Sequence, residues 1–377
     1  MLTVLVVALF LLGGVILWGQ QTYTSEGPLE TAICLRVERG SNMTRVSRDL
    51  EAQGAIASSA MFRIGAKYSE KTGDLKAGSF LIAPGSSMEE IIGQVTRSGA
   101  STCGTEIVYR VGVTRVTAEV RELDPATGTF AEKADFVLGG EGEVPAAYTE
   151  HRAEADTRYR IALAEGVTSW QIAQALKAMD VLSGEVAKVP DEGTLAPDSY
   201  EVSPGDDRAA LLAEMQERQE LRLNAAWESR AEGLPFETPG ELLIFASIVE
   251  KETGQPEERP QVASVFVNRL NRGMRLQTDP TVIYGVTKGR GVLGRGLRQS
   301  ELRRATPWNT YVIEGLPPTP IANPGKASLE AAANPAETDY LFFVADGTGG
   351  HAFAETLQQH NRKVANWREI ERQQQNN

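Results

Sequence analysis

The sequence has few residues of several types, and each shortage argues against a class of function. Its 377 residues include only 3 histidines and 2 cysteines. His351 and His360 lie near each other but have no further ligands in a zinc-type spacing. Lys and Arg (38) are outnumbered by Asp and Glu (50), which gives a formal net charge of −12. Because nucleic-acid phosphates are bound by basic surfaces, we expect no nucleic-acid partner. From the histidine and cysteine spacing we expect no metal, and we also expect no cofactor.

The N-terminal segment lacks charge altogether. Residues 1–18 carry no charged side chain, and the first basic residue is Arg36. Such a run is about long enough to cross a bilayer core. A signal-peptide core is shorter, at about 7–15 residues, and precedes a small-x-small cleavage site that is absent here. We predict an uncleaved transmembrane anchor at residues 1–19, with residues 20–377 exported, rather than a signal peptide or a buried core helix. The missing basic flank leaves open that the true start lies upstream.

The two cysteines, Cys34 and Cys103, flank one candidate domain on the side that we expect to be exported. Disulfides persist in such compartments. The sequence leaves open whether the two form a bridge or are two buried thiols.

Periodicity predicts an α+β protein in several segments. Residues 31–103 follow the pattern strand–helix–helix–strand, with the second helix around Ser59–Tyr68. Residues 104–158 alternate with period two and predict a β-hairpin insertion. Residues 159–205 repeat the strand, cap and helix of the first module more weakly. Residues 206–372 are mainly helical, with Gly- and Pro-rich loops between the helices. Thr238 and Glu241 have the spacing of a capping box, with Pro239 at the first position of the helix that they start.

Two glutamates end the apolar stretch LLIFASIVEKET, residues 242–253. A helical side chain leans back over residues i−3 and i−4. Glu250 therefore leans over the small residues 246–247, which leave a hollow, and Glu252 leans over 248–249, which fill the space. A glutamate with apolar neighbours has its protonated form favoured, as a general acid requires. We predict that Glu250 is this acid and that residues 246–247 form the floor of a cleft. The alternative is an ordinary ion pair of this glutamate with Lys251, Arg259 or Arg269 at the helix end.

A glycoside hydrolase needs a second carboxylate. The candidates in this sequence are Asp279, which also fits as a helix cap, and Glu301, which also fits as a solvated residue of a short polar helix. The match to G-x-G-x-x-G at residues 289–294 follows no clear strand and opens no helix, so we interpret it as a loop. One glutamate thus stands out without an obvious partner.

Several long motifs in a fixed order resemble the endolytic murein transglycosylase family, also called YceG-like or MltG. The motifs are ASIVEKE (246–252), VASVFVNRLNRGMRLQTDPTVIYG (262–285), GLPPTPIANPG (315–325), YLFFVADGTGGHAF (340–353) and His360-Asn361. Residues 31–103 and 159–205 resemble the family's LysM-like units, and residues 206–372 its catalytic domain. The insertion at 104–158 is less typical of the family.

The resemblance implies roles for particular residues. It makes Glu250 the catalytic acid and base, and it places five further residues near the sugar: Gln277, Thr278, Asp279, Asn309 and Tyr311. For each of these five, a hydrogen bond that stabilises a loop is the competing interpretation. Trp308 stands where the family would have a tyrosine, so an aromatic platform can persist there.

The function implied is that of a lyase. It would cleave the MurNAc–GlcNAc bond of nascent peptidoglycan strands without water, leave 1,6-anhydroMurNAc ends and limit strand elongation. The protein would be a single-pass protein of the cell inner membrane, with its C-terminal domain in the periplasm, and peptidoglycan synthases would be possible partners. The alternatives are a hydrolytic muramidase, using Glu250 with Asp279, and a non-catalytic wall-binding scaffold.

Overall fold

The computed structural model describes residues 2–97, 101–154 and 156–375. The chain divides into two compact units. The first contains the residues up to Tyr109 together with Ala118–Arg160, and the second contains Arg110–Thr117 together with the residues from Ile161 onward. Both helices and strands occur, so the predicted α+β class is confirmed.

The first helix, α1, spans Leu2–Thr24. Its large apolar side chains are exposed, including those of Phe10, Leu17 and Trp18. In the described part of the chain, no helix is both long and apolar enough to cross a membrane. The anchor at residues 1–19 therefore stays a prediction.

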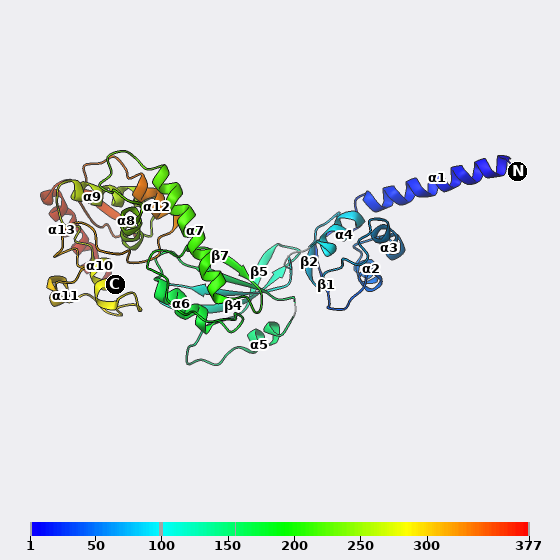
Figure 1. Cartoon of the computed structure of the whole chain (residues 1–377), viewed down its shortest axis with the longest axis horizontal. Coiled ribbons are helices and arrows are strands. Elements are labelled where there is room, and N and C mark those ends of the chain that lie inside the picture. The colour runs from blue at the N-terminus through cyan, green and yellow to red at the C-terminus, as the bar shows by residue number, and fades with distance from the viewer. Residues whose placement is uncertain (1, 98–100, 155, 376–377) are drawn as a thin grey trace. The chain divides into compact units, whose positions relative to one another are not determined.

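A small module follows in the first unit (Figure 1). Its strands β1 and β2 pair antiparallel, with Leu35 opposite Phe80, and both side chains are buried. Asn42 and Ser58 cap the two helices between the strands, because each side chain accepts a backbone N–H of the first turn. The elements are β1 (Ile33–Val37), α2 (Met43–Ala52), α3 (Ser59–Tyr68), β2 (Gly78–Ile82) and α4 (Met88–Thr96). This is the predicted order of strand, two helices and strand.

Cys34 and Cys103 form a disulfide in the structure, with their Cα atoms 5.7 Å apart. The bridge links β1 to the segment just before strand β3 (Thr105–Val111), over a sequence separation of 69. It decides the question that the sequence left open.

A five-stranded sheet has the order β5-β4-β3-β6-β7. The hairpin between β4 and β5 turns at Asp124–Gly128, where Gly128 has φ 69° and donates its N–H to the Asp124 carbonyl. Such a backbone conformation favours glycine. The elements are β3 (Thr105–Val111), β4 (Val116–Asp124), β5 (Thr129–Val137), α5 (Ala146–Arg152), β6 (Arg158–Leu163), α6 (Ser169–Ala178) and β7 (Ser199–Val202).

The two segments that look like repeats in the sequence differ in structure. Residues 159–205 contain a single helix, α6, between β6 and β7, whereas the first module has two helices between its strands. Gly184, Pro190, Gly193 and Pro197 interrupt the stretch in which a second helix would lie, because neither residue type favours a helix interior. The LysM-like character of both segments remains a prediction.

The rest of the second unit is built around helix α8, which contacts α7, α9 and α12 (Figure 1). Thr238 and Glu241 form the predicted capping box at its start, with Pro239 as its first residue. Apolar side chains are buried all round α8, and Phe245 packs edge-on against Phe266. The elements are α7 (Arg208–Glu228), α8 (Pro239–Glu252), the 3-10 helix η1 (Pro256–Glu258), α9 (Arg259–Asn271), α10 (Asp279–Thr287), α11 (Gln299–Arg303), α12 (Lys326–Ala333), the antiparallel pair β8 (Phe342–Ala345) and β9 (His351–Ala354), and α13 (Leu357–Gln375).

Candidate active site

Glu250 lies in the last turn of α8, and its carboxylate is held by the start of another helix. Its Oε2 accepts the backbone N–H of Gly325 at 2.9 Å and the hydroxyl of Ser328 at 2.7 Å. In the described part of the chain, Oε1 has no hydrogen-bond partner. The bonds therefore fix the carboxyl group through one oxygen and leave the other without a hydrogen bond.

The sequence around α12 explains how this carboxylate is held. Gly325 is the N-cap of α12, and Ser328 lies in the first turn of the helix. The first N–H groups of a helix have no partner within it, and they favour a negative group at that end. A Cβ at position 325 would overlap Oε1 of Glu165, so any larger residue there would displace the Glu165 side chain. Glycine at 325 thus lets Glu165 approach the start of α12.

The pKa of Glu250 is raised above the ordinary value of a glutamate. Burial is the largest cause, since it disfavours the charged form. The hydrogen bonds from Gly325 and Ser328 lower the pKa, the nearby Glu165 carboxylate raises it, and the Arg259 guanidinium lowers it. Burial dominates these opposing effects, so the protonated form persists to higher pH than usual.

Ser328→Ala tests this arrangement. The substitution removes a hydrogen bond that lowers the pKa of Glu250, so that pKa should rise further. In the plot of kcat/KM against pH, the limb that falls as Glu250 loses its proton should move to higher pH. Maximal activity should fall by roughly 10–150-fold, because losing one hydrogen bond to a charged group costs about 1.5–3 kcal/mol. An unchanged pH profile would show that Ser328 does not bind the reacting carboxylate.

Glu252, the other glutamate of the helix, has a different environment. Its Oε1 accepts the hydroxyl of Thr278, and no ion pair to Glu252 is found in the described ranges. Burial raises its pKa, the Thr278 hydroxyl lowers it, and Asp279 raises it. Glu252 therefore supports the start of α10 through Thr278.

The five residues predicted to bind sugar lie together, next to Glu252. The backbone N–H of Gln277 donates to the Thr310 carbonyl, and the Tyr311 hydroxyl donates to Asp279 Oδ1 at 2.7 Å. Gln277 has φ 49°, a left-handed conformation that is uncommon outside glycine. In the described structure none of the five hydrogen-bonds to Glu250. Gln277 and Asp279 are exposed, and Tyr311 is half-buried.

Thr278 and Asn309, the remaining two of the five, are buried. The Asn309 side-chain amide donates to three backbone carbonyls, those of Glu301, Leu302 and Arg304. These contacts favour the alternative stated for the two residues, namely stabilisation of the loop that carries Tyr311.

Neither candidate second carboxylate pairs with Glu250 in the described structure. Asp279 accepts from Tyr311, as above. Glu301 is ion-paired with Arg295 at 2.6 Å, and the hydrogen bond from Arg295 lowers the pKa of Glu301 to about 2.

The expected cleft floor at residues 246–247 is wrong. Ala246 and Ser247 are fully buried. Ser247 Oγ accepts the backbone N–H of Ile321 at 3.0 Å and donates to the Ile244 carbonyl. The chain around residue 321 fills the hollow that the small side chains leave.

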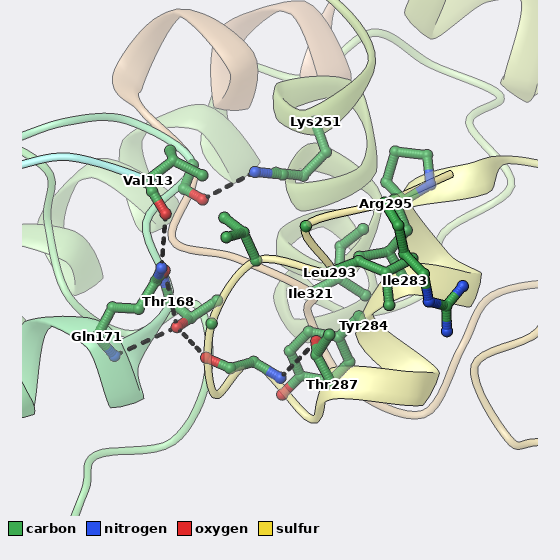
Figure 2. A pocket seen from close by; sticks show the side chains of 16 residues that line it. Val113, Thr168, Gln171, Lys251, Ile283, Tyr284, Thr287, Leu293, Arg295 and Ile321 are labelled. Carbon is green, nitrogen blue, oxygen red and sulfur yellow. Dashed lines mark hydrogen bonds between the residues drawn. The ribbon is translucent and has the colours of Figure 1, made fainter. Parts of the chain in front are cut away.

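A cavity of about 350 Å³ lies beside Glu250. Figure 2 shows Lys251 on one side of it and Tyr284 and Thr287 on the other. Lys251 Nζ donates to the Gly166 carbonyl at 3.2 Å, and burial lowers the pKa of this lysine. Glu250 does not line the cavity, but a Cβ at Gly166, which does, would lie 3.6 Å from Glu250 Cγ. The loop 289–294 forms part of the wall, so the G-x-G-x-x-G match is a loop, as predicted.

Sequence reasoning missed three residues of this site: Glu165, Gly325 and Ser328. Pro324-Gly325 before a helix, with a serine in its first turn, is a recognisable helix start that could bind an anion. The position of Glu165 has no such local signal, because it depends on contact between segments 160 residues apart, 165 and 325.

The geometry defines a class of site. A single half-buried glutamate has a raised pKa, one free oxygen and a neighbouring cavity, which together suit general acid and base catalysis. Among the described residues, no group of three or more His, Cys, Asp or Glu side chains could hold a metal ion.

Comparison with known proteins places the chain in a family. Residues 35–366 match the YceG-like family, so the chain belongs to it, and the family prediction is confirmed. A protein of Bacillus subtilis (strain 168) named endolytic murein transglycosylase is 28% identical over 353 residues, which are 93% of this chain and 89% of that protein. A protein of the same name from Streptococcus pneumoniae serotype 2 (strain D39) is 28% identical over 341 residues, 88% of this chain. The match spans 58% of the pneumococcal protein's length.

A crystal structure of a yceG-like protein from Listeria monocytogenes is also similar. It aligns with a TM-score of 0.47 at 25% sequence identity, and the alignment covers 88% of this chain and 99% of that one.

Proposed function

We propose that this protein is an endolytic murein transglycosylase, a lyase that cuts the MurNAc–GlcNAc bond of peptidoglycan and leaves a 1,6-anhydroMurNAc end. Membership of the YceG-like family and the names of two relatives support the substrate class. The observation that carries the proposal is the environment of Glu250, whose pKa is raised by burial and whose Oε1 is free in the described structure.

In the first step, Glu250 is the acid. Its proton passes from Oε1 to the glycosidic oxygen, and the bond between that oxygen and muramic C1 breaks. The N–H of Gly325 and the hydroxyl of Ser328 then stabilise the carboxylate that forms. A raised pKa serves this step, because the acid must hold its proton near neutral pH.

In the second step, Glu250 is the base. The C6 hydroxyl of the same sugar attacks C1 and gives its proton to the Glu250 carboxylate, which restores the starting form. The attacking hydroxyl is intramolecular, so it replaces both water and an enzymic nucleophile. One carboxylate therefore suffices, which agrees with the engagement of Asp279 and Glu301 elsewhere.

We assign the cavity beside Glu250 to the sugar residues that flank the cut. Its wall combines apolar side chains, such as those of Ile283 and Ile321, with the Lys251 ammonium, as sugar sites require. Gln277, Asp279 and Tyr311 are retained as more distant substrate contacts, because they are not fully buried. Thr278 and Asn309 act on substrate only through the loops that they hold.

Digestion of defined glycan strands tests the proposal. The purified protein should release fragments from within the strand, with anhydro ends that are lighter than hydrolytic products by one water. Reducing-end products would favour a hydrolytic muramidase instead. Binding to sacculi without release of soluble fragments would favour a wall-binding scaffold.

We also propose attachment to the cell inner membrane through residues 1–19, with the remainder in the periplasm beside peptidoglycan synthases. The absence of charge in residues 1–18 and the exposed apolar side chains of α1 support attachment. The modules 31–103 and 159–205 would bind the glycan, and residues 206–372 would form the catalytic domain, with residues 104–158 inserted between the modules.

Deletion of residues 1–19 tests the attachment. The full chain should stay in the membrane pellet after an alkaline carbonate wash, whereas the shortened chain should become soluble and keep its cleavage activity. A full chain recovered in the soluble fraction would contradict attachment.

A further inference from the structure

A second carboxylate lies close to the one proposed to react. Glu165 is in the loop between β6 and α6, and its side chain is 42% exposed. Its Oε1 sits against Gly325, the residue whose N–H donates to Glu250 Oε2 at 2.9 Å. Its Oε2 is 3.4 Å from Nη2 of Arg259, the first residue of α9. Three separate segments thus bring Glu165, Arg259 and Glu250 around one glycine.

We propose that Glu165 is a positioning residue of this active site, whose carboxylate, placed against Gly325, adds to burial in favouring the proton-bearing form of Glu250 until the substrate takes the proton. The inference rests on the proposed function, because it assumes that Glu250 acts as an acid. Two like charges close together disfavour each other's ionisation. Glu165 is exposed and paired with Arg259, whereas Glu250 is partly buried, so the protonated form is favoured at Glu250.

The packing at Gly325 supports a dedicated contact. Any side chain at position 325 would displace the Glu165 carboxylate, so the chain leaves room for it there. Arg259 is buried, and its Nε has no hydrogen-bond partner in the described residues. Its Nη2 contacts the Glu165 carboxylate. The ion pair between Glu165 and Arg259 is half-exposed on the Glu165 side, and such pairs contribute little to the free energy of folding. Stability alone therefore does not explain this contact.

Other charged groups near Glu250 do not account for the effect. Lys251 on the same helix donates to the Gly166 carbonyl, and the carboxylates that act on its pKa are those of Glu250 and Glu192. On α12, Lys326 is paired with Glu330 at the surface. On α10, Asp279 acts on Glu252. For Glu250 itself, the charged groups that shift its pKa are Glu165, which raises it, and Arg259, which lowers it.

Glu165→Gln in the full chain tests the proposal. Removing the charge should lower the pKa of Glu250, so the alkaline limb of kcat/KM should move to lower pH by on the order of 0.5–1 pH unit. Activity well below that limb should stay within about threefold, because Glu250 is protonated there in both proteins. Glu330→Gln, a matched surface change on α12, should leave the profile in place.

Arg259→Met gives a second test with the opposite sign. It removes the positive charge that lowers the pKa of Glu250 and leaves the Glu165 side chain in place, so the limb should move to higher pH. Glu165→Asp should restore part of the native profile. The proposal would be overturned if the alkaline limb of kcat/KM lay at the native pH in both Glu165→Gln and Arg259→Met. An equal loss of activity at every pH would overturn it as well. If Glu165→Gln does not fold, the direction of the Arg259→Met shift decides. Product masses from the native enzyme are read in the same reactions, so a failure of the lytic assignment is seen separately from the limb positions.

Discussion

Glu250→Gln should reduce glycan cleavage by at least about 10³-fold while leaving the protein folded. General acid or base catalysis by one group contributes about 10²–10⁴-fold, and Glu250 serves as both in turn. The glutamine amide cannot protonate the glycosidic oxygen or accept the proton of the C6 hydroxyl. Its oxygen can still accept the N–H of Gly325, so the helix contact survives.

The neighbouring glutamate provides the comparison. Glu252→Gln retains an oxygen that can accept the Thr278 hydroxyl, so we expect cleavage to stay within about tenfold of the native rate. Thermal unfolding monitored by circular dichroism would establish that both variants fold. Full activity in Glu250→Gln, or a greater loss in Glu252→Gln, would contradict the assignment of the acid.

Replacing both Cys34 and Cys103 with serine should destabilise the first unit by about 4 kcal/mol. The bridge closes a loop over a sequence separation of 69, and a cross-link of that span restricts the unfolded chain by about this amount. The contacts of β1 with β2 remain, so the native module can still form.

Denaturant unfolding measures this loss as a lower midpoint for the first unit. Native protein under strong reducing conditions should show the same change, and the double-serine variant should not respond to reductant. Equal stabilities of oxidised and reduced protein would show that the bridge contributes nothing to the fold. Cleavage of short glycan strands should change little, because Glu250 and its partners lie in the second unit.

Local signals predicted individual elements well. Helix α3 spans the predicted Ser59–Tyr68, and the capping box at Thr238 marks the start of α8. Cap residues and apolar spacing act within one or two turns, so they can be read from the chain. The strand order of the sheet was harder to predict from the sequence. The order β5-β4-β3-β6-β7 joins strands of the insertion to those of the following segment. That pairing depends on long-range contacts.

Only the part of the candidate site that depends on local signals could be predicted from the sequence. Glu250 could be chosen from side-chain direction and family motifs, but the argument from a hollow over residues 246–247 failed. The sequence showed that these residues are small, and it did not show that the chain around Ile321 covers them. The partners Glu165 and Ser328 come from segments far from α8, so no spacing rule could bring them to Glu250.

The most direct test of the account is cleavage in water enriched in ¹⁸O. A lytic reaction closes the C6 oxygen onto C1 and consumes no water, so we predict anhydro-muramic ends of unlabelled mass. Glu250→Gln run in parallel should yield no such product. Muramic reducing ends that carry one ¹⁸O atom at the time of cleavage would mean that water attacks C1, and they would contradict the lytic mechanism.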